Sequence, residues 1–315
     1  MARNMLFLPA LLIAGLSASV GPAQAELLGP VSVGAPGAGD EIFVVGRQQA
    51  SREAVDRFVD SLLAETADGR IARWGEALCL KIEGLSSRQA RYFAGRIAAV
   101  ASELGLRIRS GGDCVPAAYI LFASQAAPLL ARIRTDRPSF FGAIPSSEVH
   151  EFLASRAPVR WLSHAQLRGT YGEMPFSFSL ATGASDTGRP VTGMRSLPSR
   201  LRNGSRSELQ SMLIVVDASR LGRVSFRSLS AYLAMVVLGN PLKGEVAMPS
   251  IMQIFDRDRA QGGLIADDLT NWDLAFLASL YQGNWNMPAE QRRARIRASM
   301  ERDLDREEVG SLRTR

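Results

Sequence analysis

Two histidines are the residues of this sequence that are best suited to metal or acid–base chemistry. His150 is followed directly by Glu151, and His164 lies further along the chain. A catalytic zinc ion needs two or three neutral imidazoles, commonly arranged as His-Glu-x-x-His on one helix. His150 and Glu151 begin that pattern, but Ala154 stands where the second histidine should be. One helical turn therefore offers too few ligands, and we expect surface histidines and no bound metal.

The sequence has no recognisable motif for an activated nucleophile or for a phosphate-binding loop. A Gly-x-Ser-x-Gly elbow or a glycine-rich loop would follow a strand, and neither pattern occurs in that context. Asp217 ends an apolar run and Tyr232 lies in a predicted helix, so we expect both to be buried, hydrogen-bonded structural groups. Asp267 and Asp268 are expected in a solvated turn rather than in a glycosidase pair. We therefore predict no catalytic residue and no cofactor.

The amino terminus has the features of an export signal. Arg3 precedes an uncharged apolar run over residues 6–20, and Ala23-Gln24-Ala25 has the small-x-small pattern that signal peptidase recognises. The run is short for a membrane span, and no later segment approaches the roughly 20 apolar residues of a spanning helix. We expect cleavage near Ala25, removal of residues 1–25, and a soluble periplasmic or secreted mature chain without a transmembrane segment.

Export changes the meaning of the two cysteines. In an oxidising compartment, Cys79 and Cys114 are more often bridged than catalytic. Closing the loop between them would stabilise the fold by roughly 3–4 kcal/mol. Two buried free thiols are the alternative, whereas a cysteine nucleophile would need a histidine that the neighbouring sequence does not supply.

Composition indicates a globular chain and argues against a nucleic-acid partner. The 315 residues are 46% hydrophobic, 22% charged and 7% aromatic, which excludes a mainly disordered, collagen-like or multi-span membrane protein. The net charge is +6, and Lys81 and Lys243 are the only lysines. A nucleic-acid surface would require a stripe of basic residues among aromatic residues. The arginines form no such stripe and are interleaved with acids.

The first half of the mature chain predicts a small α/β lobe over residues 41–145. After a flexible leader at 26–40, strands are expected at 41–46, 78–82, 106–108 and 119–122. Helices are expected from Ser51, after a cap at Ser86 or Ser87, and at 125–133, because their apolar residues repeat with helical spacing. A strand–helix–strand order favours a layered α/β arrangement that the Cys79–Cys114 disulfide would link.

A second lobe is predicted over residues 146–288, followed by a charged helix or tail at 289–315. Its expected parts are an isolated strand at 156–162, an irregular loop at 181–207 and a strand at 212–216. Ser225 and Thr270 are predicted to cap two further helices, the latter in a capping box with Asp273. The arginine-rich tail could attach to a membrane surface, but the acids beside it favour a solvated helix.

Part of the second lobe resembles the end of the metzincin-type zinc proteases. The resembling segments are Pro249-Ser-Ile-Met252, Ala266-Asp-Asp-Leu-Thr-Asn-Trp-Asp273 and Leu280-Tyr-Gln-Gly283. The resemblance implies that Met252 is a Met-turn residue and that the helix after Ser225 is the zinc-binding helix. The whole chain is also similar to exported bacterial proteins to which no activity is assigned.

The resemblance implies a scaffold that has lost its metal. The family's zinc ligands and general base would fall near Ala231, Tyr232, Met235 and Pro241, and none of these can play those parts. The predicted fold class is therefore α+β, with a disulfide-linked strand–helix–strand layer and a C-terminal helical region of degenerate zincin-like type.

These features favour an exported, non-catalytic protein. It would be a degenerate peptidase-like scaffold or a binding module for a protein or another cell-envelope component. The alternative is an exported hydrolase, possibly metal-dependent, whose site brings together distant residues, with His150, Glu151 and His164 as candidates. Asp217 and Tyr232 complete the set of candidate functional residues, and the question for the structure is whether one cleft contains them.

Overall fold

The computed structural model describes nine segments of the chain, all within one compact unit, Gln48–Arg315. The segments are residues 52–66, 69–75, 77–109, 114–169, 176–178, 191–193, 205–246, 249–256 and 266–313. The expected signal peptide, leader and first strand (41–46) lie outside the described residues.

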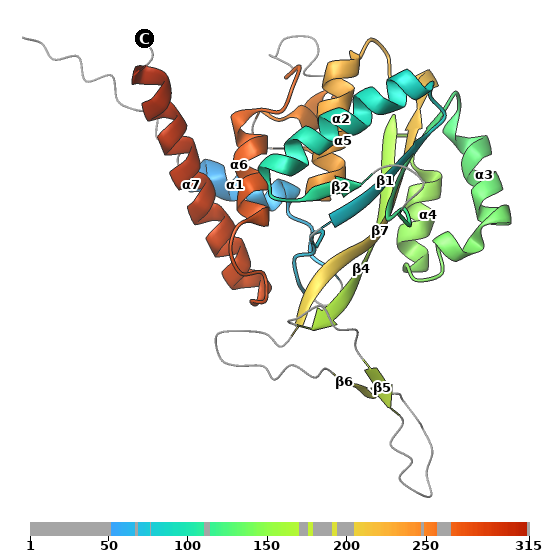
Figure 1. Cartoon of the computed structure of the whole chain (residues 1–315), viewed down its shortest axis with the longest axis horizontal. Helices are drawn as coiled ribbons and strands as arrows, with labels where there is room; N and C mark the ends of the chain where they lie inside the picture. Colours follow the sequence, from blue (N-terminus) through green and yellow to red (C-terminus); the bar gives the residue numbers. More distant parts are fainter. Residues whose placement is uncertain are drawn as a thin grey trace, which may run out of the picture. The chain divides into compact units, whose positions relative to one another are not determined.

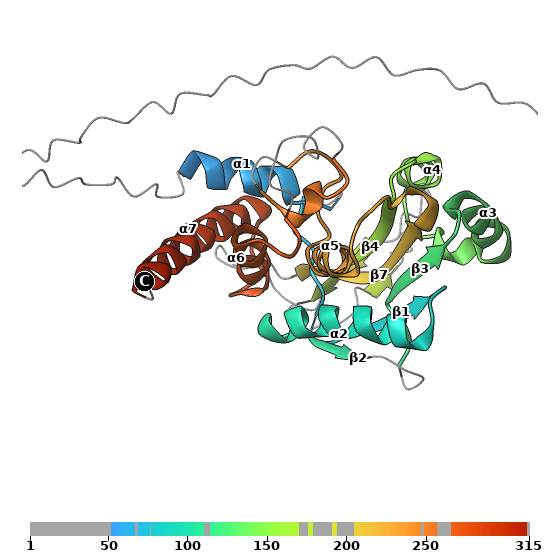
Figure 2. The same ribbon diagram turned by 90° about the horizontal axis from the view of Figure 1, so that it is seen from above.

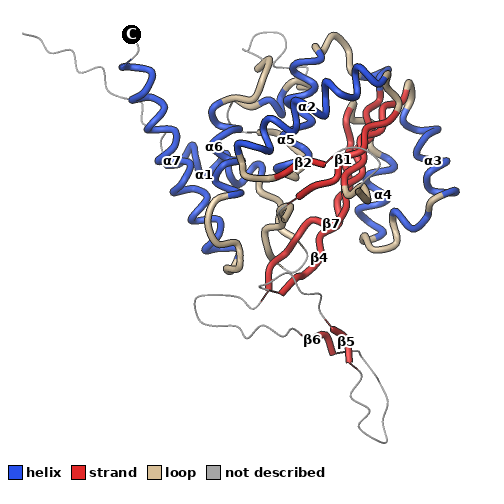
Figure 3. The backbone as a smooth tube through the Cα atoms, viewed as in Figure 1, coloured by secondary structure: helices blue, strands red, loops and turns tan. Residues whose placement is uncertain are grey.

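A five-stranded mixed sheet forms the centre of this unit (Figures 1 and 3). In spatial order its strands are β2 (Arg107–Arg109), β1 (Ala77–Glu83), β3 (Ala118–Ala123), β7 (Ser205–Asp217) and β4 (Val159–Gly169). The first four strands are parallel, and β4 pairs antiparallel with β7. Strands from both of the predicted lobes, 41–145 and 146–288, therefore share one sheet, with β4 at one of its edges.

Both faces of the sheet are covered, as the sequence of β7 requires. Successive side chains of a strand point to opposite faces. Met212, Ile214 and Val216 face one hydrophobic core, whereas Leu213 and Val215 face the other. Figure 2 shows α2 (Ser87–Glu103) and α5 (Phe226–Gly239) on one side of the sheet, and α3 (Ala126–Asp136) and α4 (Ser146–Ala154) on the other.

Three further helices pack together and extend the first core. They are α1 (Arg52–Leu62), α6 (Asn271–Tyr281) and α7 (Ala289–Arg313). Ile296 and Met300 of α7 are completely buried. The remaining elements are the strand pair β5 (Phe176–Phe178) and β6 (Val191–Gly193) and the 3-10 helices η1 (Pro138–Phe140), η2 (Ala218–Arg220) and η3 (Ile251–Gln253).

The mixed α/β class and the Cys79–Cys114 disulfide are confirmed. The disulfide joins β1 to the segment before β3, and its Cα atoms are 6.0 Å apart. The predicted cap of α2 is Ser86, and the predicted capping box of Thr270 and Asp273 begins α6; Ser86 also forms a capping box, with Gln89. In both, the cap side chain accepts from a backbone N–H that has no partner within the helix.

The strand predicted at 156–162 is present as β4, but its bounds differ and it is not isolated. β4 extends to Gly169 and forms a continuous ladder with β7, with a register shift between His164 and Ala165. The residues after Leu162 are mainly polar, so the second half of the strand has no apolar run that would predict it. The partner strand β7 lies far along the chain, and a local sequence pattern cannot indicate that pairing. The helix α4 was also missed, although Val149, Phe152 and Leu153 have helical spacing.

Two other expectations need correction. The range 181–207 is not wholly irregular, because it contains β6 and the first residues of β7; its other residues lie outside the described part of the chain. The solvated helix predicted near the carboxy terminus is instead docked on α1 and α6. Asp60 of α1 accepts hydrogen bonds from Arg293 and Arg297, at 2.7 Å each.

Arg292 shows most clearly why α7 is not solvated. Its side chain is 2% exposed and donates to the carbonyls of Leu280, Gln282 and Asn284. These carbonyls lie at the end of α6, where backbone acceptors have no partner within the helix. Burial, assisted by the neighbouring charges of Arg73 and Arg295, lowers the pKa of Arg292 to about 10, so it remains a cation at neutral pH.

Candidate functional site

Two adjoining cavities lie beside the edge strand β4. The larger has a volume of about 520 Å³ and the smaller about 220 Å³, and both are lined by Glu151, Trp161, Leu242 and Lys243. We call the two together the β4 cleft. Residues 159–165 of β4 all contribute to its lining. Because neighbouring side chains of a strand point to opposite faces, a cavity that touches all of them must follow the edge of the strand.

The backbone of β4 presents hydrogen-bonding groups to this cleft. In an antiparallel pair, every second residue bonds to the partner strand. Asp217 N donates to the carbonyl of Pro158 at 2.8 Å. The backbone hydrogen-bonding groups of residues 158, 160 and 162 therefore face β7. The N–H and C=O groups of Trp161 and Ser163 therefore point away from β7. Within the described residues, neither makes a backbone hydrogen bond to another element.

The opposite wall is made by α4 and by the loop after α5. Asn240 ends α5 in the left-handed conformation, with φ 44°, and donates its N–H to the carbonyl of Val236. This conformation is tolerated by asparagine better than by most residues and turns the chain sharply at a helix end. It directs residues 240–243 into the cleft lining.

Carboxylates outnumber cations in the larger part of the cleft. Among the described residues, its lining includes Glu65, Glu148 and Glu151, with Lys243 as the one lysine or arginine. Lys243 Nζ donates to Glu151 Oε1 at 3.3 Å, and Glu65 pairs with Arg293 of α7. Glu148 has no ion pair in the described part of the chain. The cleft is therefore suited to a ligand that carries positive charge.

The structure brings some of the candidate residues together and separates others. His164 and Glu151 line the larger part of the cleft, and Glu151 and Tyr232 line the smaller part. His150 is exposed on α4 and is not among the lining residues. Among the described residues, no hydrogen bond joins His164 to Glu151 or to Ser163, and no three His, Cys, Asp or Glu residues form a potential metal site.

Tyr232 supplies a neutral hydroxyl rather than a nucleophile. Its side chain is 6% exposed, and its ring packs edge-on against Phe255 at 5.0 Å between centroids. Burial raises the pKa of Tyr232 well above its usual value, so the phenol stays protonated at neutral pH. It can exchange hydrogen bonds with a ligand but cannot readily act as an anion.

Asp217 is a buried structural group at the end of β7. Its carboxylate accepts hydrogen bonds from Ala126 N at 3.0 Å and from the backbone and hydroxyl of Ser219 at 3.2 and 2.6 Å. Arg160 lies 3.9 Å away, and both side chains are 5% exposed. Burial opposes ionisation, but the hydrogen bonds and Arg220 outweigh it and lower the pKa of Asp217.

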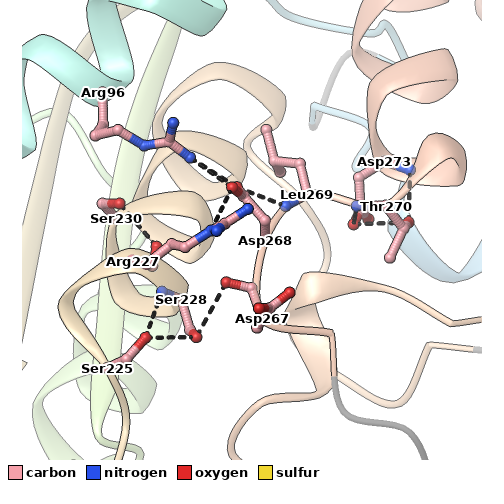
Figure 4. A network of polar contacts seen from close by, with 10 residues as sticks. All are labelled: Arg96, Ser225, Arg227, Ser228, Ser230, Asp267, Asp268, Leu269, Thr270 and Asp273. Atoms are coloured by element: carbon pink, nitrogen blue, oxygen red, sulfur yellow. Dashed lines mark hydrogen bonds and ion pairs between the residues drawn. The ribbon is translucent and has the colours of Figure 1, made fainter.

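Asp268 is not a solvated acid, in contrast to the sequence prediction. Its carboxylate accepts from Arg96 of α2 at 2.8 Å and from Arg227 of α5 at 2.9 Å (Figure 4). The backbone N–H of Leu269 is a third donor, at 2.9 Å. Figure 4 also shows the neighbouring Asp267, whose carbonyl accepts from Ser228. Asp268 therefore ties α2 and α5 together and is unavailable as one of a catalytic pair.

Replacing Asp268 with asparagine is expected to lower the free energy of unfolding by about 1 kcal/mol at pH 7, since partly exposed ion pairs contribute little. Burial opposes ionisation of Asp268, but the bonds from Leu269, Arg227 and Arg96 prevail and lower its pKa. The difference between the two proteins should therefore be complete above about pH 4, the usual pKa of aspartate, and shrink as the pH falls further. Urea unfolding across this pH range measures it.

Asp267→Asn is the matched control, because Asp267 is exposed and only its backbone carbonyl is bonded. We expect it to change stability by less than about 0.5 kcal/mol at every pH. A difference for Asp268→Asn that grows on acidification would contradict the assigned direction of the pKa shift.

Sequence reasoning missed Glu148, Ser163 and Lys243 as residues of the cleft. Glu148 lies on the helix that was not predicted, and Ser163 on the half of β4 that was not predicted. Lys243 follows the Asn240-Pro241 stop after α5, and its position in a loop carries no pattern. Among the residues that line the cleft, Glu151, His164 and Tyr232 had been identified from the sequence.

Comparisons with known proteins do not assign this chain to a family. No family model, no curated protein and no solved structure matches it. Within the described segments, no helix combines the length and the apolar character needed to span a membrane.

Proposed function

We propose that this chain is an exported, non-catalytic binding protein whose β4 cleft receives an extended segment of another polypeptide. The observation that carries the proposal is the outward direction of the backbone groups of Trp161 and Ser163 at a sheet edge that is also the wall of a cavity. An extended segment can add to such an edge as a further strand, with main-chain hydrogen bonds giving the affinity.

The dimensions and charge of the cleft support this occupant. Seven residues of β4, 159–165, line it, and at about 3.3 Å per residue this length accommodates a strand of similar size. The register shift after His164 interrupts the regular edge and sets its far limit. The carboxylate of Glu148 favours a segment that carries lysine or arginine.

Export is supported by the amino-terminal signal pattern and by the disulfide. Cys79 and Cys114 are bonded, and structural disulfides persist mainly in oxidising compartments. The proposed zincin-like origin is supported by one placement: Met252 and Tyr232 line the same smaller part of the cleft. A scaffold that has exchanged a metal site for a peptide-binding edge would retain such an arrangement.

The test uses the purified mature chain and a fluorescein-labelled peptide of alternating valine and lysine, with a valine–glutamate peptide for comparison. Ser163→Pro removes the outward N–H but leaves the bonds to β7, because proline is tolerated where the N–H faces away from the sheet. We expect at least about a tenfold loss of affinity for the valine–lysine peptide, measured by fluorescence anisotropy. Ser163→Ala keeps the N–H and should bind like the wild type.

Equal binding by Ser163→Pro and Ser163→Ala, with both variants folded by circular dichroism, would contradict the proposal. So would a preference for the valine–glutamate peptide. The same samples also test the hydrolase alternative, which is favoured by the presence of His164 and Glu151 in one cleft. Mass spectrometry should find the peptide intact after prolonged incubation; cleavage that depends on His164 would support the enzyme instead.

A further inference from the structure

A third cavity, of about 470 Å³, is lined by three arginines and is separate from the β4 cleft. Arg73 comes from the segment before β1, Arg107 begins β2, and Arg206 lies on β7. Tyr281 and Trp285, at and just after the end of α6, complete the lining that matters here. We call this the arginine cavity.

Aromatic rings hold two of the three guanidinium groups in place. The guanidinium carbon of Arg73 lies 4.2 Å from the centroid of Trp285 and 5.2 Å from that of Tyr281. That of Arg206 lies 4.4 Å from the centroid of Trp285. Arg73 Nη1 also donates to the carbonyl of Tyr281 at 2.7 Å. Stacking and a carbonyl bond orient the cations without neutralising them.

Only one carboxylate compensates these charges within the described residues. Glu208 Oε2 lies 3.3 Å from Arg206 Nη2. Arg107 is exposed and forms no ion pair, and the buried Nε of Arg73 has no hydrogen-bond partner. Burial, together with repulsion from Arg206, outweighs the favourable interactions with Tyr281 and Glu208 and lowers the pKa of Arg73. Two guanidinium groups, those of Arg73 and Arg107, therefore have no carboxylate partner beside the same cavity.

From this arrangement we propose that the arginine cavity binds a phosphate group. Guanidinium groups match the geometry of phosphate oxygens, and several of them around one cavity favour an oxyanion. A phosphate monoester or inorganic phosphate carries up to two negative charges near neutral pH, which suits two uncompensated cations better than a single carboxylate does. The proposal does not depend on the β4 cleft, with which this cavity shares no lining residue.

Isothermal titration calorimetry with inorganic phosphate tests the proposal. The wild type should bind with a stoichiometry near one, and binding should weaken as sodium chloride is raised, because salt screens exposed charges. Arg107→Gln should reduce the affinity about tenfold while leaving the fold unchanged, since Arg107 is exposed and unpaired. Arg73→Gln should abolish measurable binding.

Arg88→Gln, on the exposed surface of α2, is the matched loss of one positive charge and should bind phosphate like the wild type. Ser163→Pro should do so as well, which separates this result from the peptide experiment. The proposal is overturned if inorganic phosphate does not bind, or if Arg107→Gln and Arg88→Gln bind it equally. Sedimentation with phosphatidylcholine vesicles, with and without phosphatidic acid, identifies the source of the phosphate group. Selective binding to the vesicles that contain phosphatidic acid, lost in Arg107→Gln, indicates a lipid headgroup. No binding to either kind of vesicle indicates a free phosphate compound.

Discussion

Replacing Asp217 with alanine is expected to lower the free energy of unfolding by roughly 3–5 kcal/mol, because it breaks a buried ion pair on one side. Arg160 would keep its charge in a site where its side chain is 5% exposed. Ala126 would also lose the acceptor of its backbone N–H, and Ser219, whose N–H is shared with the carbonyl of Ser124, would lose one of two acceptors. Equilibrium unfolding in urea, followed by circular dichroism, measures the loss.

A double variant that also replaces Arg160 distinguishes the loss of the ion pair from a general destabilising effect of substitution. Arg160→Met combined with Asp217→Ala should be less destabilising than the sum of the two single changes, since no unpaired guanidinium remains. Asp136→Ala, at the exposed end of α3, is the matched control and should be nearly neutral. A loss of less than about 1 kcal/mol for Asp217→Ala would show that water reaches the pair and that it is not a structural centre.

Removing the disulfide is expected to cost roughly 3–4 kcal/mol, because the bridge restricts the unfolded chain. Cys79 and Cys114 are 35 residues apart in sequence, and the bridge anchors β1 to the segment that leads into β3. The double variant Cys79→Ala/Cys114→Ala avoids a free thiol, and alanine suits position 79, which is 8% exposed. Urea unfolding again gives the difference.

The wild type treated with a thiol reductant should unfold at the same urea concentration as the double variant. Mass spectrometry before and after reduction and alkylation should find no free thiol in the untreated protein. Two alkylatable thiols in the untreated protein, or an unchanged unfolding midpoint for the variant, would contradict the assigned role of the bridge.

Local sequence pattern was sufficient for much of this fold. The caps at Ser86 and Thr270, the apolar spacing of α1, α2 and α5 and the β-favouring run of β7 all depend on residues within one or two turns of each other. The disulfide was predicted from the expected export and from the presence of only two cysteines in the sequence. Each of these features has a physical cause that acts over a short stretch of chain or on the whole composition.

The edge position of β4 could not be read in the same way. Its partner β7 is separated from it by residues 170–204, and pairing across such a distance is decided by the packing of both sheet faces. The apolar Trp161 and Leu162 predicted a strand, but residues 163–168, which are mainly polar, do not continue the apolar run. The β4 cleft depends on that pairing, which is why Ser163 was not recognised.

The candidate residues illustrate the difference between type and position. His150 and Glu151 are neighbours in sequence, yet Glu151 lines the β4 cleft and His150 does not, because adjacent residues of a helix point about 100° apart. His164 reaches the same cleft from β4. The arginine cavity is similar: Arg73, Arg206 and Trp285 belong to no sequence motif, and only the folded chain brings them together.

Amide hydrogen exchange tests the peptide-binding proposal most directly, because it reports on the backbone groups that carry it. In the free protein, the N–H groups of Trp161 and Ser163 should exchange faster than those of Arg160 and Leu162, which face β7. With the valine–lysine peptide bound, we predict that Trp161 and Ser163 become as strongly protected as their neighbours. Bound peptide that leaves their exchange unchanged would show that β4 does not receive a strand.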